Sequence, residues 1–224
     1  MYGENPRLEV VPHLPAGARS ALDVGCGRGG FGATLRRTYG PQARLVGVEP
    51  VAEQAARARE SGEFDEVLDG YFPDAFEGRD DRFDLVTFND VLEHIVDPAA
   101  VLRETARVLT PEGRVVAAIP NVAYAPVVLD LVRNRWDYTD EGILDRTHVR
   151  FFTRSSSVRL FEESGFEVES CAGINSIGKR WATDPFAPRR LVKRGVARAI
   201  GDHRYLHFVV VGRPRAAGAR PTAR

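Results

Sequence analysis

The chain has 224 residues, with 31 Lys and Arg balanced by 31 Asp and Glu and with only two Cys. Its content of 43% hydrophobic and 28% charged residues is typical of a globular protein and excludes a disordered chain or a fibre. No apolar run approaches the ~18–20 residues that a membrane helix needs, and no apolar stretch is typical of a signal peptide. Two Cys are too few for a disulfide framework. We therefore expect a cytoplasmic enzyme or binding domain.

Short β-branched runs alternate along the chain with segments of helical pattern. The runs predict strands at Ser20–Val24, Arg44–Val48, Glu66–Leu68, Phe83–Phe88, Gly113–Ile119, Phe166–Ser170 and Leu206–Val211. The segments between them predict helices at Gly30–Tyr39, Val51–Ser61, Pro98–Leu109, Pro126–Arg133, Arg154–Ser164 and Pro188–Ile200. Because most of the strands are apolar along their whole length, the pattern predicts a doubly wound α/β sheet with helices on both faces.

We expect one domain over residues 1–215, with two elaborations and a disordered Ala/Gly/Arg-rich tail at 216–224. The segment 121–153 is long, aromatic and rich in both charges, so it is a candidate acceptor-binding insertion. We expect residues 176–204 to form a basic helical segment. From Ser176 onward the chain has 12 Lys and Arg against two acids, Asp184 and Asp202. Such a surface can contact an anionic membrane, or it can rest on the acidic body with its arginines solvated.

A glycine-rich loop follows the first predicted strand. Its spacing is Gly25-x-Gly27-x-x-Gly30, and a predicted helix comes directly after it. Glycines here allow a tight turn and let a ligand lie against bare backbone, near the positive end of the helix. This spacing is shared by NAD, FAD and other adenosine-containing ligands, so the loop alone does not choose between them.

Two acids separate these ligands. Asp23 stands at the end of the first strand, where it would repel a pyrophosphate but attract an ammonium or a sulfonium group. Glu49 closes the second strand, where a carboxylate accepts hydrogen bonds from both hydroxyls of a ribose. The pair favours S-adenosylmethionine over NAD.

Three motifs, in order, resemble those of class I S-adenosylmethionine-dependent methyltransferases. The stretch Leu22-Asp23-Val24-Gly25-Cys26-Gly27 looks like motif I, residues 83–94 resemble the fourth strand with its following loop, and residues 109–114 resemble the turn before the fifth strand. The closest groups are the ubiquinone-biosynthesis O-methyltransferases and methyltransferases associated with bacterial surface-polysaccharide assembly. The resemblance covers about residues 5–211. It implies a seven-stranded Rossmann-like sheet with an antiparallel last strand.

The resemblance also implies roles for individual residues. Arg7, in Asn5-Pro6-Arg7, would hold the carboxylate of the cofactor, and Asn89 takes a position whose backbone lies near its methionine part. Relatives often bind the adenine through an acid after the third strand, and here either Asp69 or the backbone would do so. The expected cofactor site therefore consists of Arg7, Asp23, Gly25, Gly27, Glu49 and Asn89.

The acceptor chemistry points to histidine. An acceptor hydroxyl ionises far above pH 7 and needs a base or a metal ion, whereas a neutral amine needs less help. His94 and His148 follow strands at the end where α/β sheets bind ligands, and we expect His148 to remove the proton. His13, His203 and His207 are poorer candidates, because they lie in the N-terminal segment or flank the last strand.

A second resemblance concerns metal binding. Asp90-x-x-Glu93-His94 with the later His148 resembles the metal site of small-RNA 3′-terminal 2′-O-methyltransferases, which carry Glu-x-x-Glu-His and a distant His. Here Asp90 replaces the first Glu. The set can bind a divalent cation such as Mg²⁺ or Mn²⁺, can use His94 directly as acid or base, or can simply pack Glu93 and His94 at a helix start. The sequence leaves these interpretations open, so no metal ligand is assigned.

These features predict an S-adenosylmethionine-dependent methyltransferase that methylates a hydroxyl of a sugar or similar small molecule, alone or linked to a nucleotide, lipid or polysaccharide. In the segment 121–153, aromatic side chains can stack on a sugar ring, and Arg146 or Arg150 can pair with a phosphate. The alternatives are an N-methyltransferase, an RNA 2′-O-methyltransferase, an NAD-dependent dehydrogenase and a protein that binds without turnover. Nucleic acid is disfavoured because the body is acidic. The sequence fits a monomer or a dimer.

Overall fold

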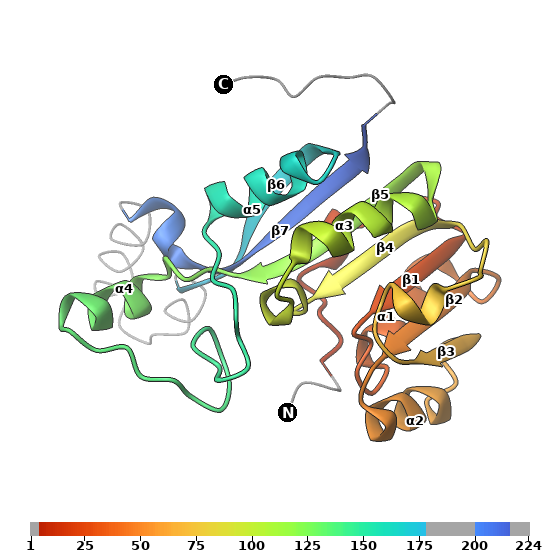
Figure 1. Cartoon of the computed structure of the whole chain (residues 1–224), viewed down its shortest axis with the longest axis horizontal. Helices are drawn as coiled ribbons and strands as arrows, with labels where there is room; N and C mark the ends of the chain where they lie inside the picture. Colours follow the sequence, from red (N-terminus) through yellow and green to blue (C-terminus); the bar gives the residue numbers. More distant parts are fainter. Residues whose placement is uncertain (1–4, 178–199, 216–224) are drawn as a thin grey trace, which may run out of the picture.

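The computed structural model describes residues 5–177 and 200–215, which form one seven-stranded sheet (Figure 1). The strand order is β3-β2-β1-β4-β5-β7-β6. β7 runs antiparallel to both of its neighbours, and the pairs from β3 to β5 are parallel. This confirms the predicted antiparallel last strand. The strands are β1 (Ser20–Val24), β2 (Arg44–Glu49), β3 (Glu66–Asp69), β4 (Phe83–Asn89), β5 (Leu109–Pro120), β6 (Phe166–Ser176) and β7 (Tyr205–Pro214).

Five α-helices in the described residues differ from their predicted bounds by at most one residue. They are α1 (Gly30–Tyr39), α2 (Ala52–Glu60), α3 (Pro98–Val108), α4 (Ala125–Val132) and α5 (Arg154–Glu163). Local capping explains two of the starts, because the side chains of Asp97 and Thr153 accept hydrogen bonds from backbone amides of α3 and α5. Four short 3₁₀ helices were not predicted: η1 (Val11–His13), η2 (Asp74–Phe76), η3 (Leu92–His94) and η4 (Gly201–Arg204).

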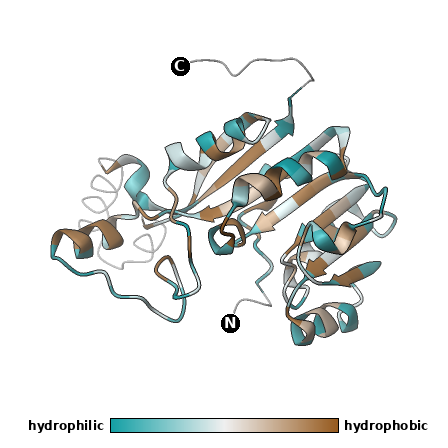
Figure 2. Ribbon diagram, in the orientation of Figure 1, coloured by the Kyte–Doolittle hydropathy of each residue, from teal (hydrophilic) through white to brown (hydrophobic). Residues whose placement is uncertain are grey.

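Helices cover both faces of the sheet, as predicted. Figure 2 shows largely apolar strands and mixed hydrophilic and apolar surfaces on α3 and α5, whereas α4, at the left of the view, is mostly hydrophobic. One apolar cluster packs beneath α3 and α5 and includes Phe83, Phe88, Leu102, Phe161 and Phe166. The other packs beneath α1 and α2 and includes Phe31, Leu35, Leu45, Ala55 and Ala58. Burial of these side chains on both faces explains why the central strands β1, β2 and β4 are mostly apolar.

The strand ends matter most for the site. β2, β3 and β4 each run one residue beyond their predicted ends, and the added residues are polar: Glu49, Asp69 and Asn89. β1, β2 and β4 are mutually parallel neighbours, so their carboxyl ends lie at one edge. β5 begins at Leu109 instead of Gly113, because the predicted turn is an irregular stretch of the strand in which the register against β4 shifts.

The expected insertion over 121–153 contains α4 and a loop that returns to the sheet through a bridge between Asn121 and Phe152. The predicted helix Pro188–Ile200 lies outside the described residues except for Ile200, and the tail 216–224 lies outside them entirely. Within the described part of the chain, no helix has the length and apolar character needed to cross a membrane.

Candidate active site

Left-handed glycines shape the loop between β1 and α1. Gly25 has a φ of +72° and Gly27 a φ of +55°. The amides of Gly25 and Cys26 donate to the carbonyl of Val48 at 2.8 and 3.1 Å, which holds the loop against the end of β2. A Cβ on Gly25 would lie 2.6 Å from Cγ2 of Val91, so a side chain there would collide with the loop after β4. A glycine at this position therefore lets the loop after β1 pack closely against Val91 in the loop after β4.

Glu49 is fixed at the end of β2 by two backbone amides. Its Oε2 accepts a hydrogen bond from the amide of Gly27 at 2.9 Å, and its Oε1 accepts one from the amide of Val51 at 3.0 Å. The residue is 6% exposed. The predicted pair of loop and acid is thus a single unit, in which the glycine loop orients the carboxylate.

Asp23 is buried at the end of β1. Its Oδ1 accepts a hydrogen bond from the hydroxyl of Thr87 at 2.7 Å, and sequence analysis did not single out Thr87. Burial raises the pKa of Asp23 to about 7, against the opposing effect of the Thr87 hydrogen bond. An ammonium or sulfonium group beside this carboxyl would favour its charged form, so the site is suited to a cationic ligand.

Asn89 ends β4 on the same edge. Its buried side-chain amide lies beside Asp23 and favours the charged form of that carboxyl, but neither polar atom of the amide makes a hydrogen bond of ordinary geometry among the described residues. A buried polar group without a partner costs roughly 1–3 kcal/mol, so this amide fits a polar group of a ligand. At the end of β3, Asp69 forms an ion pair with Arg59 at 2.5 Å and is largely exposed.

Arg7 reaches the site from the N-terminal segment and is 6% exposed. Its Nη1 donates to Oδ2 of Asp90 at 2.5 Å, and its Nε lies 3.3 Å from Oε1 of Glu9. On the other side of Asp90, Nε2 of His207 lies 3.2 Å from Oδ1. Sequence analysis grouped Asp90 with a metal set and treated His207 as a strand flank, but the fold joins them in one network with Arg7. Strand periodicity contains no signal for that contact.

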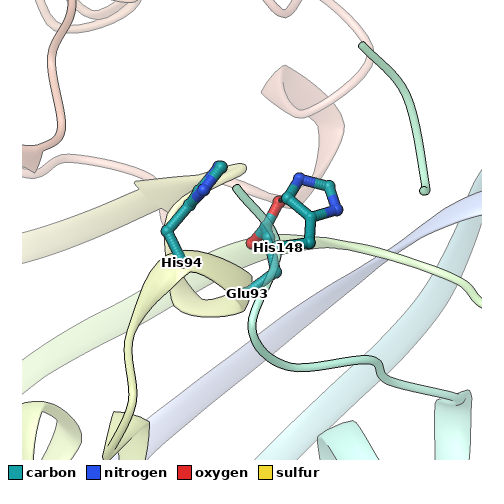
Figure 3. Close-up of side chains that lie close together, drawn as sticks. All are labelled: Glu93, His94 and His148. Carbon is teal, nitrogen blue, oxygen red and sulfur yellow. Dashed lines mark ion pairs between the residues drawn. The ribbon is translucent and has the colours of Figure 1, made fainter. Parts of the chain in front are cut away.

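Glu93, His94 and His148 form a second cluster, shown in Figure 3. One possible ligand atom from each lies within 4.8 Å of the others. Nε2 of His148 lies 3.9 Å from Oε1 of Glu93. The imidazole rings of His94 and His148 pack edge to face with their centroids 4.7 Å apart. Asp90 is not part of this set, because Arg7 and His207 engage it.

Backbone carbonyls of the loop hold Nδ1 of both histidine rings. Nδ1 of His148 lies 2.8 Å from the carbonyl of Ile143, so Nδ1 carries the proton and Nε2 presents a lone pair. Nδ1 of His94 lies 3.2 Å from the carbonyl of Thr147. Both carboxylate oxygens of Glu93 and Nε2 of His148 are buried without a hydrogen-bond partner among the described residues.

The cluster is electrostatically poised for a positive charge. Burial and the neighbouring Asp90 charge raise the pKa of Glu93 well above its usual value. Burial and the nearby His148 ring lower the pKa of His94, which favours its neutral form. A cation between these groups would favour the charged carboxylate and keep both rings neutral. One carboxylate and two imidazoles are a common donor set for Zn²⁺ and other divalent transition metals.

The loop that carries His148 is attached to η3 by its backbone. The amides of Val149 and Arg150 both donate to the carbonyl of Glu93 at 3.0 Å. The guanidinium of Arg150 binds the carbonyl of Val96, and Arg146 pairs with Asp140 at the surface. Both arginines predicted to bind a phosphate therefore have a contact within the protein, and both are exposed.

Comparisons with known proteins agree with this geometry. The family model described as a methyltransferase domain matches residues 7–171. The ubiquinone biosynthesis O-methyltransferase of Xanthomonas axonopodis pv. citri is 34% identical over 181 residues, which cover 78% of this chain and 74% of that protein. The enzyme of the same name from Rhodopseudomonas palustris is 29% identical over 71% of this chain and 64% of its own length. A SAM-dependent methyltransferase structure from Archaeoglobus fulgidus has the same fold, with a TM-score of 0.65 at 16% identity, over 92% of this chain and 90% of that one.

The chain belongs to the class I S-adenosylmethionine-dependent methyltransferases, as its motifs predicted. This membership decides against a nicotinamide dehydrogenase. The residues present fit the cofactor, because the glycine loop after β1, the buried Asp23 carboxyl and the Asn89 amide lie at one edge of the sheet. The chain spans about three fifths of the length of the first curated relatives it matches.

Proposed function

We propose that this protein transfers the methyl group of S-adenosylmethionine to a hydroxyl oxygen of a small molecule, most simply a sugar or a sugar-like acceptor. The observation that carries the proposal is the buried pair of Glu93 and His148. It begins four residues after Asn89, so a group able to handle a proton follows directly on the predicted cofactor site. The O-methyltransferase names of the relatives support oxygen over nitrogen as the acceptor.

We assign cofactor contacts by chemistry. Glu49 accepts hydrogen bonds from the ribose hydroxyls, and Asp23 faces the positive charge of the amino-acid end. Arg7 binds the carboxylate, and Asn89 contacts the methionine part. The carboxyl ends of β1, β2 and β4 provide three of these four groups, which supports the assignment.

In the reaction, the acceptor oxygen forms a bond to the methyl carbon while the carbon–sulfur bond breaks and its electron pair stays on sulfur. The acceptor's hydroxyl proton moves to Nε2 of His148, and the products are the methyl ether and S-adenosylhomocysteine. The enzyme mainly aligns donor and acceptor and accepts this proton. The Nδ1–H donated to Ile143 keeps the Nε2 lone pair available.

One observation favours a second arrangement of the same cluster. Nε2 of His148 is buried against Glu93, so an acceptor reaches it only if the loop carrying His148 moves. A divalent cation held by Glu93, His94 and His148 would use the three inward-facing ligand atoms as they stand. Such a cation supplies a Lewis acid that lowers the pKa of an acceptor hydroxyl. The role of His148 is then that of a ligand.

The acceptor contact is proposed for the segment 121–153. Trp136 and Phe151 pack edge to face with centroids 5.4 Å apart, and Tyr138 lies nearby in sequence and is 44% exposed. Exposed aromatic faces of this kind can stack on a sugar ring. Contact of the basic segment 176–204 with a membrane carrying a lipid-linked acceptor remains a proposal from the sequence, and nucleic acid remains disfavoured.

Methyl transfer from radiolabelled S-adenosylmethionine to matched acceptors tests the proposal. Sugar nucleotides and free sugars should be labelled, while the same compounds with the candidate hydroxyl replaced by hydrogen should not. Preferential labelling of amine analogues would instead establish an N-methyltransferase. RNA labelling with a steep salt dependence of oligonucleotide affinity would favour the RNA alternative.

Metal analysis separates the two arrangements of the cluster. If the cation is used, EDTA-treated protein should bind one Mn²⁺ or Zn²⁺ per chain, and Glu93→Gln should abolish this binding. If His148 acts directly, EDTA leaves the transfer rate unchanged while His148→Ala lowers it by about 10²–10⁴-fold.

A further inference from the structure

Two residues with strained backbone meet at the methionine end of the site. Arg7 has a φ of +46° and Asp90 a φ of +55°, values that residues other than glycine rarely adopt. Their side chains form the 2.5 Å contact between Nη1 and Oδ2. Strained residues persist only where the surrounding structure holds them, and they concentrate at binding sites. The ion pair between these two residues therefore fixes the position of the Arg7 guanidinium.

Asp90 is held from three directions. Its amide donates to the carbonyl of Ala118 on β5 at 3.1 Å. Its two carboxylate oxygens face Arg7 and, 3.2 Å away on β7, His207. The neighbouring His207 and Arg7 lower the pKa of Asp90 despite its burial, so the carboxylate is charged. β7 thus fixes Asp90, and Asp90 fixes Arg7.

Arg7 keeps part of its donor set for a ligand. Its buried Nη2 has no hydrogen-bond partner among the described residues. Its backbone is tied down as well, because its amide donates to Oδ1 of Asn5 at 3.0 Å and the Thr34 hydroxyl donates to the carbonyl of Pro6 at 2.6 Å. A buried guanidinium with a fixed orientation and a free amino group suits a carboxylate.

We propose that Asp90 and His207 are positioning residues that set the Arg7 guanidinium for the carboxylate of the cofactor's amino-acid end. This inference rests on the proposed cofactor contact of Arg7. We further infer that the protein prefers a ligand with an intact amino-acid end because His207 on β7 holds Asp90 and Asp90 holds Arg7. The two residues act through Arg7 and do not touch the ribose or the adenine.

Two ligands separate this role from a structural one. S-adenosylhomocysteine carries the amino-acid end, and 5′-methylthioadenosine has the same adenosine and sulfur without it. Calorimetric titration of Asp90→Asn and His207→Gln should show the dissociation constant of S-adenosylhomocysteine raised roughly tenfold. The constant for 5′-methylthioadenosine should stay within about twofold of wild type. Asp202→Asn, at an exposed carboxylate outside the network, is the matched control and should change neither constant.

A double-variant cycle tests whether the effect passes through Arg7. Arg7→Gln should weaken S-adenosylhomocysteine selectively, and adding Asp90→Asn to it should cause little further loss. Equal weakening of both ligands, or full additivity, would overturn the proposal. If wild-type protein binds neither ligand, the proposed cofactor site itself fails, which is a different outcome from binding without a selective loss.

Discussion

Glu93 and His148 come from separate segments, yet Oε1 of Glu93 and Nε2 of His148 lie 3.9 Å apart with both side chains almost fully buried. The backbone explains this contact, because two consecutive amides after His148 donate to the carbonyl of Glu93. The loop that carries the histidine is therefore docked on the 3₁₀ helix that carries the acid. These two hydrogen bonds oppose separation of the His148 loop from η3.

If Glu93 holds a cation together with His94 and His148, Glu93→Gln should abolish activity without destabilising the fold. The raised pKa of Glu93 means that its buried carboxyl favours the protonated form, and glutamine has nearly the same shape. Wild-type stability should fall as the pH rises above about 4.3, because the unfolded chain then releases a proton that the folded chain retains. Urea unfolding of both proteins from pH 4 to pH 8 measures this. The free energy of unfolding of Glu93→Gln should therefore rise relative to that of wild type as the pH increases. A fall in the variant's relative stability at high pH would contradict the account.

Asp23→Asn should weaken cofactor binding and make the protein more stable than wild type at neutral and higher pH. Burial raises the pKa of Asp23 to about 7, so the unfolded chain ionises this carboxyl well before the folded chain does. Wild-type protein therefore loses stability between about pH 4 and pH 7, by about 4 kcal/mol in all, and the variant avoids that loss. Urea unfolding at pH 4 and pH 8 should show the variant gaining on wild type at the higher pH. Its affinity for S-adenosylhomocysteine should fall.

Gly25→Ala should abolish cofactor binding, and Gly17→Ala provides a matched control. The two glycines have φ values of +72° and +73°, so alanine costs each a similar backbone strain of about 1–2 kcal/mol. A Cβ on Gly17 meets nothing within 4 Å, whereas a Cβ on Gly25 meets Val91 at 2.6 Å. Thermal unfolding and titration with S-adenosylhomocysteine should show both variants less stable and only Gly25→Ala unable to bind. Equal affinities of the two variants for S-adenosylhomocysteine would show that the close packing of Gly25 against Val91 has no role in cofactor binding.

The fold was predictable from the sequence because local patterns carry most of it. Short β-branched runs predicted every strand of the sheet, most of them apolar along their length, and the helices between them follow from ordinary periodicity. The start of β5 was not predictable, since Thr110, Glu112 and Arg114 interrupt the apolar run where the strand is irregular. The polar last residues of β2 and β4, Glu49 and Asn89, were predictable as ligand contacts because each stands at the end of a recognisable strand motif.

The candidate site was predictable only where a motif spans a few residues. Asp23, Gly25, Gly27 and Glu49 belong to segments with recognisable spacing, and they lie together at one edge. Thr87 and His207 have no such spacing, since each is one position in a strand whose neighbour depends on register. The side chain of Asp90 likewise pairs with Arg7, which is distant in sequence. The motif that contains Asp90 and Glu93 therefore could not show that Asp90 contacts Arg7 and stays outside the Glu93 cluster.

Calorimetric titration of the purified protein with S-adenosylhomocysteine, with NAD as the control ligand, tests the central claim most directly. The account predicts micromolar affinity for S-adenosylhomocysteine and no heat from NAD, because the Asp23 carboxyl faces the ligand from the end of β1 and repels a pyrophosphate. The affinity should fall in Glu49→Gln, which keeps the shape of the side chain but loses its charge. Tight NAD binding without binding of S-adenosylhomocysteine would contradict the interpretation of Asp23 and the function built on it.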